Sequence, residues 1–153
     1  MKKYPESKLK LNRQGRLFDD CKELIKKLNL EEKVKFLDNI KSWDELPLVY
    51  KNSDILLFPA KFSNGNFTIL EAMASGMGIV ISNKIKGTTN LFEGESGYIC
   101  SLNKREFLDS IQEYIDHPEK FRKHGEINRN IVKSKSGQGT AELYKYLIGQ
   151  LYE

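Results

Sequence analysis

The stretch from Asp54 to Ser82 constrains the fold of this chain most, because it reads as strand, loop, helix and strand. An apolar run ends at Pro59, a polar loop containing glycine follows, and a helix is predicted to begin near Thr68. In an open parallel sheet such a loop lies at the carboxyl edge, where the first backbone N–H groups of the next helix face solvent and can bind an anion. The segment therefore predicts a parallel sheet with a site for a phosphate-bearing ligand.

Short apolar runs and amphipathic segments alternate along the rest of the chain. The apolar runs predict strands at residues 8–12, 33–37, 54–58, 78–82 and 97–100. Helical patterns lie between them at residues 16–29, 45–51, 68–75 and 88–92, and continue at 103–116, 118–133 and 139–152. This alternation predicts one α/β domain over residues 1–153, a Rossmann-like parallel sheet with helices on both faces, followed by a helical C-terminal tail.

An apolar stripe runs along the helix predicted over residues 16–29 and is expected to pack against the sheet. Its members are Leu17, Cys21, Leu24, Ile25 and Leu28. Cys21 and Cys100 have neither metal-ligand spacing nor the density of a disulfide scaffold, so both are predicted to be reduced packing residues. His117 and His124 are expected at the surface, and no protein-bound metal is predicted.

The charge pattern limits the classes of partner. Charged residues make up 30% of the chain, and the net charge is +4. Lys and Arg are spread over predicted helices that also carry Glu and Asp. This spread argues against nucleic-acid binding, whereas a basic balance is compatible with contact with anionic lipid. No apolar run approaches the roughly 20 residues needed to span a bilayer, and no signal-peptide pattern opens the chain. We therefore expect a cytoplasmic protein, with peripheral contact at the inner face of the membrane left open.

Glu71 has two interpretations. Thr68 and Glu71 have the spacing of a capping box, in which Thr68 is the N-cap of the helix and Glu71 bonds back to it. Alternatively, a carboxylate in the first helical turn lies at the mouth of the crevice, where it can accept hydrogen bonds from the vicinal hydroxyls of a ribose. Local spacing favours the cap, and both interpretations stay open at this point.

Several segments resemble a known family. They are FPA at 58–60, LEAMASG at 70–76 and IVI at 79–81, with KVKFL at 33–37 and DELPLVY at 44–50 upstream and NLFEGESGY at 90–98 downstream. Together they resemble the donor-binding half of the retaining glycosyltransferases of family 4, which are two-domain, GT-B type enzymes. The resemblance covers nearly the whole chain and is clearest over residues 30–100. It implies a C-terminal-type GT-B domain whose first strand, and the N-terminal acceptor-binding domain, are expected to be absent from this chain.

The resemblance also implies roles for individual residues. In the family, two glutamates with seven residues between them flank the loop, and Glu71 matches the second, which contacts the ribose. Ser63 stands where the first would be, and since a serine carries no negative charge it cannot stabilise a developing oxocarbenium ion as a carboxylate does. The other implied contacts are backbone amides of Gly65, Asn66, Phe67 and Thr68 for the diphosphate, Lys61 as a point charge beside it, and Asn39 and Ile40 for the nucleobase.

Length supports a partial enzyme, because 153 residues suit one compact domain and a complete enzyme of this type needs two. The leading interpretation is the donor-binding half of a hexosyltransferase, which transfers a sugar with retention from a UDP- or GDP-sugar to a glycan or lipid-linked acceptor. It needs no cofactor and is active only when an acceptor-binding domain or chain completes the cleft.

The alternatives are a non-catalytic sugar-nucleotide-binding or scaffold protein and a sugar-nucleotide epimerase. A second copy of this chain, in a homodimer, is a further candidate partner.

Overall fold

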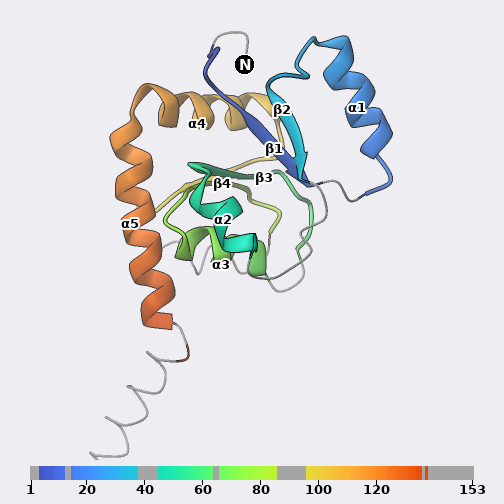
Figure 1. Cartoon of the computed structure of the whole chain (residues 1–153). Coiled ribbons are helices and arrows are strands. Elements are labelled where there is room, and N and C mark those ends of the chain that lie inside the picture. Colours follow the sequence, from blue (N-terminus) through green and yellow to red (C-terminus); the bar gives the residue numbers. More distant parts are fainter. Residues whose placement is uncertain are drawn as a thin grey trace, which may run out of the picture. The chain divides into compact units, whose positions relative to one another are not determined.

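The computed structural model describes residues 4–12, 15–37, 45–63, 66–85, 96–135 and 137 (Figure 1). The chain divides into two compact units, Met1–Leu46 and Pro47–Glu153. The expectation of a single domain over residues 1–153 stays a prediction. Among the described residues, no helix combines the length and the apolar character needed to cross a membrane.

The first unit is a β-α-β arrangement. It consists of β1 (Leu9–Asn12), α1 (Phe18–Lys27) and β2 (Val34–Leu37). The two strands are parallel, with Leu9 opposite Val34, and α1 connects them. The rings of Phe18 and Phe36 meet edge to face with their centroids 4.7 Å apart, which joins the start of α1 to β2.

The prediction that the stripe of α1 packs against the sheet is wrong for all its members except Ile25, which is half-buried. No residue of α1 is buried, Cys21 is exposed, and Leu24 is 54% exposed. Leu17 and Leu28, which flank the helix, are also exposed. Neighbouring strands lie only about 5 Å apart, so a two-stranded sheet is too narrow to cover the whole apolar side of a helix. The periodicity located the helix correctly, but it did not show how much sheet that helix has to pack on.

The second unit contains a three-stranded parallel sheet in the order β3-β4-β5. The strands are β3 (Ile55–Phe58), β4 (Gly78–Ser82) and β5 (Tyr98–Cys100). The helices are α2 (Leu46–Lys51), α3 (Phe67–Ala74), α4 (Lys104–Asp116) and α5 (Pro118–Lys135). The predicted boundaries agree with these to within two residues, while the helices predicted at 88–92 and 139–152 lie outside the described residues. The α/β architecture with parallel strands is confirmed.

Helices cover both faces of this sheet, and β4 is buried throughout. Ile79 and Ile81 point to one side, where they pack with Ile69 and Met73 of α3 and with residues of α5. Val80 points to the other side and packs with Tyr114 of α4. This alternation along one strand is what a central strand between two helical layers requires.

A buried polar cluster joins α4 and α5, and it corrects the prediction that His124 is a surface residue. His124 is only 6% exposed, and its Nδ1 lies 2.8 Å from the hydroxyl oxygen of Tyr114. Nearby, the side-chain amide of Asn128 donates to the carbonyls of Met77 and Ser96. Cys100 is buried, as predicted, and its burial raises the pKa of the thiol. His117, in contrast, is exposed.

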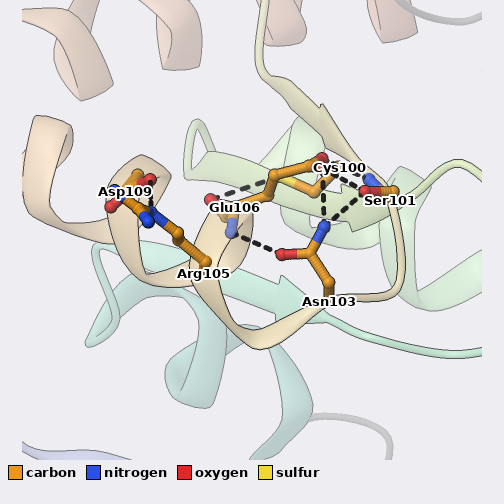
Figure 2. A network of polar contacts seen from close by, with 6 residues as sticks. All are labelled: Cys100, Ser101, Asn103, Arg105, Glu106 and Asp109. Atoms are coloured by element: carbon orange, nitrogen blue, oxygen red, sulfur yellow. Dashed lines mark hydrogen bonds and ion pairs between the residues drawn. The ribbon is translucent and has the colours of Figure 1, made fainter.

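The N-terminus of α4 has a reciprocal side-chain cap (Figure 2). The Oδ1 atom of Asn103 accepts a hydrogen bond of 2.9 Å from the backbone N–H of Glu106. The carboxylate of Glu106 in turn accepts from the backbone N–H of Ser101 at 2.6 Å, and also from the Ser101 hydroxyl and the Asn103 amide. The arrangement differs from a capping box in one contact, because the carboxylate accepts from the N–H of Ser101 and not from that of the N-cap Asn103, and it orients the turn that links β5 to α4.

Candidate functional site

The turn from β3 into α3 contains the candidate anion site. β3 ends at Phe58, and α3 begins at Phe67 with Asn66 as its N-cap. Asn66 has φ 55°, in the left-handed region that asparagine tolerates, and its side chain makes no capping hydrogen bond. The N–H groups of Ile69 and Leu70 both donate to the Asn66 carbonyl, at 3.0 Å each.

Within the described part of the chain, the first N–H groups of α3 are therefore available to a ligand. The amides of Phe67 and Thr68 lie ahead of the first helical hydrogen bonds, where a helix leaves its donors without intrahelical acceptors. The positive end of the helix dipole points to the same place, and it favours a negative charge there. Thr68 is exposed and Phe67 is 70% exposed, so this end of the helix is open to solvent.

The capping box predicted for Thr68 and Glu71 is wrong. Because Asn66 can adopt the left-handed conformation, the helix begins at Phe67, and Thr68 is already a helical residue. Glu71 is then the fifth residue of α3, beyond the position from which a side chain can bond back to the N-cap. Its Oε2 atom instead accepts a hydrogen bond of 2.7 Å from the hydroxyl of Tyr50 on α2.

Tyr50 is the side chain at this site that sequence reasoning missed. Tyr50 and Glu71 are both half-buried. Burial, and then the hydrogen bond to the Glu71 carboxylate, raises the pKa of Tyr50 well above that of an exposed tyrosine, although the Thr68 hydroxyl opposes the rise. The phenol therefore stays protonated and donates at neutral pH. Tyr50 lies in the segment 44–50 that supported the resemblance, but no local spacing links it to a residue 21 positions further on.

The other predicted site residues have different outcomes. Ser63 is half-buried and Lys61 is exposed, both in the loop that follows β3. Gly65, Asn39 and Ile40 lie outside the described residues, so their roles stay predictions.

The parallel register brings a further polar segment to the same sheet edge. Phe58 lies opposite Ile81, so the loop after β3 and the turn after β4 leave the sheet at the same edge. In that turn Asn83 and Lys84 are exposed, and the backbone N–H of Lys84 donates to the Ser82 hydroxyl at 3.0 Å. Lys84 therefore adds a positive charge at the edge that also holds the N-terminus of α3.

An apolar hollow of about 310 Å³ lies between β3 and α4. Its lining consists of Leu57, Pro59, Leu102, Asn103, Lys104, Phe107, Leu108 and Ile111. Apolar side chains predominate, and a diphosphate buried against them would lose its hydration without gaining enough donors. The candidate anion site is therefore the N-terminus of α3 and not this hollow.

Sequence comparison places the chain among known proteins. The family model described as "Glycosyl transferases group 1" matches residues 2–131. An uncharacterized glycosyltransferase of Haemophilus influenzae is 29% identical over 149 residues, a match that covers 96% of this chain and 41% of the relative. The chain thus spans about two-fifths of the length of this relative.

Solved structures share the fold. Sucrose-phosphate synthase from Thermosynechococcus elongatus superimposes with a TM-score of 0.77 at 21% identity, over 98% of this chain and 40% of the other. Anabaena Alr3699/HepE in complex with UDP superimposes with a TM-score of 0.72 at 20% identity, over 94% of this chain and 42% of the other. At these identities the likeness establishes the architecture, which is that of GT-B glycosyltransferases.

Proposed function

Because the chain belongs to the family of group 1 glycosyl transferases, we propose that it binds the nucleotide-sugar donor of a retaining glycosyltransferase. The observation that carries the proposal is the open N-terminus of α3, with available amides at Phe67 and Thr68 and the Glu71 carboxylate one turn further along the same helix. Amides that donate to an anion, next to a carboxylate that accepts from hydroxyls, match a nucleoside diphosphate, which has both a diphosphate and a ribose diol.

Each part of the donor has proposed contacts. The diphosphate lies on the amides at the start of α3, from Gly65 to Thr68, where the helix dipole favours its charge. Lys61 and Lys84 supply positive charge from the two loops at this sheet edge. Glu71 accepts hydrogen bonds from the ribose hydroxyls, and Asn39 and Ile40 receive the nucleobase.

UDP is the first nucleotide to test. The neighbouring fold of Alr3699/HepE has been solved with UDP and with UDP-glucose, which supports a uridine nucleotide as donor. GDP is the second nucleotide to test, because contacts to the phosphates and to the ribose alone do not distinguish the two bases.

Transfer needs more than donor binding. Ser63, at the proposed place of an acidic residue, can form hydrogen bonds but carries no charge to stabilise an oxocarbenium-like transition state. We therefore propose that the sugar passes to a glycan or lipid-linked acceptor, in the cytoplasm, only when an acceptor-binding domain or chain completes the cleft. The serine equally favours the second candidate function, a non-catalytic protein that binds the nucleotide sugar.

Calorimetric titration of the chain with UDP and with GDP tests the proposal. We expect saturable binding of one of them, and Glu71→Ala should weaken it at least about tenfold, because hydrogen bonds to a charged group are lost. Glu126→Ala, which removes an exposed carboxylate from α5, is the matched control and should bind as the parent does. Failure of the folded parent to bind either nucleotide would contradict the proposal.

The two candidate functions separate in a second experiment. Addition of a candidate acceptor-binding chain, with donor sugar and acceptor, should produce transfer if this chain is half of an enzyme. Binding without turnover under the same conditions would favour the non-catalytic protein. Efficient transfer by this chain alone would contradict the need for a separate acceptor-binding domain.

A further inference from the structure

The hydrogen bond between Tyr50 and Glu71 joins α2 to α3 across 21 residues of sequence. We propose that Tyr50 is a positioning residue, which holds the Glu71 carboxylate in the orientation that accepts the ribose diol of a nucleoside diphosphate. This inference rests on the proposed function and adds a residue that the resemblance did not assign to the site.

The first support is the geometry of the contact. Glu71 is half-buried near the start of α3, and its flexible side chain could otherwise adopt several rotamers. A bond of 2.7 Å from Tyr50 to Oε2 selects one of them. The carboxylate is then already ordered when the ligand arrives, so binding does not have to supply the cost of ordering it.

The second support is the remaining capacity of the carboxylate. An ionised carboxylate has about four acceptor sites, and the bond from Tyr50 occupies one of them. The remaining sites are enough for the two hydroxyls of a ribose. Among the described residues, the structure gives the Glu71 carboxylate one donor on one oxygen, which orients the group and leaves acceptor sites for a ligand.

The third support is the state of the Tyr50 hydroxyl. Its raised pKa keeps the phenol protonated at neutral pH, so it remains a donor to the carboxylate. Thr68, one turn before Glu71 on α3, also interacts with the Tyr50 side chain. Tyr50 therefore contacts the same stretch of helix whose amides are proposed to bind the diphosphate.

The test compares two nucleotides that differ only at the ribose. UDP and 2′-deoxy-UDP, or GDP and 2′-deoxy-GDP if GDP binds better, are titrated against the full chain and its variants. We expect Tyr50→Phe to weaken binding of the ribonucleotide about tenfold. Binding of the deoxynucleotide should weaken less, so the preference for the ribonucleotide falls.

Glu71→Gln should lose the same preference, and the double variant Tyr50→Phe with Glu71→Gln should lose little more, because the two residues act through one carboxylate. Glu71→Asp provides an independent variant. Its side chain keeps the negative charge but is one methylene shorter and no longer reaches Tyr50, so it should also lose the preference for the ribonucleotide.

The matched control is Tyr114→Phe, which removes another tyrosine hydroxyl that forms a hydrogen bond, on α4. It should lower stability and leave the preference for the ribonucleotide unchanged. If Glu71→Gln loses the preference while folded Tyr50→Phe keeps it, Tyr50 is a structural residue only and the inference is overturned. If Glu71→Gln keeps both affinity and preference, the proposed role of Glu71 fails first.

Discussion

Gly125 lies on α5 where that helix passes the turn after α3. A Cβ atom at this position would come within 2.0 Å of the carbonyl oxygen of Gly76. Gly76 itself has φ +76°, a conformation that side chains rarely adopt, and it ends α3. A side chain at Gly125 would therefore force the two backbones apart, whereas one at Gly76 would meet the flexible Arg129 side chain and be strained by its positive φ.

Gly125→Ala should lower the free energy of unfolding by about 1–3 kcal/mol or more, because the neighbouring atom is backbone and cannot rotate away. Urea unfolding followed by circular dichroism measures the change. Gly137→Ala is the control, since nothing lies within 4 Å of a Cβ at that position, and its effect should stay within about 0.5 kcal/mol. Equal stability of the two variants would contradict the close approach of α5 to Gly76.

The capping network of α4 determines how one helix begins. Its N-terminus has side-chain acceptors for its backbone donors, whereas α3 has none from its N-cap. The two helices therefore begin differently: the first turn of α4 is closed by side chains (Figure 2), and the N-cap side chain of α3 makes no such bond.

Asn103→Ala should destabilise the protein by about 0.5–2 kcal/mol, because the N–H of Glu106 loses its acceptor. Chemical denaturation gives the value. Asn103→Ser retains a side-chain acceptor at the N-cap without setting a second carboxylate beside Glu106, and should recover part of the loss. An Asn103→Ala variant as stable as the parent would mean that the hydrogen bond from the Glu106 N–H to Asn103 contributes little to stability.

The same network predicts that the stability of the fold depends on pH. Hydrogen bonds from Ser101, and then from Asn103, lower the pKa of Glu106 in the folded chain. The charged carboxylate is thus favoured by folding, and its contribution is present above the ordinary glutamate pKa and is lost as the pH falls through the lower folded value.

Glu106→Gln should therefore reduce the loss of stability seen when the pH is lowered from about 5 to 3, and leave a lower but flatter profile. Thermal unfolding across this range measures it, with Glu126→Gln as the control. An unchanged slope in Glu106→Gln would show that the network does not favour the charged carboxylate.

Considered as a whole, the chain is two compact units, and the described residues of the proposed donor site lie in the second. Tyr50, Lys61, Phe67, Thr68, Glu71 and Lys84 all belong to Pro47–Glu153. The proposed phosphate and ribose contacts should therefore stabilise the fold of that unit, while the proposed nucleobase contacts, Asn39 and Ile40, belong to Met1–Leu46.

UDP, or GDP if it is the nucleotide that binds, should raise the unfolding temperature of the chain by about 5–10 °C at a concentration about 100 times its dissociation constant. Differential scanning calorimetry measures the shift and shows whether one or two transitions occur. Glu71→Ala, if it binds about tenfold more weakly, should show about half this shift at the same concentration. A shift of equal size in this variant would place the nucleotide elsewhere.

Local patterns predicted the order and bounds of the strands and helices well. Strands such as 78–82 are apolar on both faces, and helices such as 103–116 carry their own start signals, so each is specified by neighbouring residues. The same information identified the turn before α3 as a candidate anion site and Glu71 as its carboxylate. Family resemblance then supplied the roles that spacing alone left open.

Contacts between distant residues decided the rest. Periodicity shows that α1 has an apolar side but not that none of its residues is buried, and His124, expected at the surface, is held in the core by Tyr114. Thr68 and Glu71 have capping spacing, yet a left-handed Asn66 begins the helix earlier and Tyr50 takes the carboxylate. Such partners are separated by many residues in the chain and meet only when the elements pack, which is why spacing along the sequence does not reveal them.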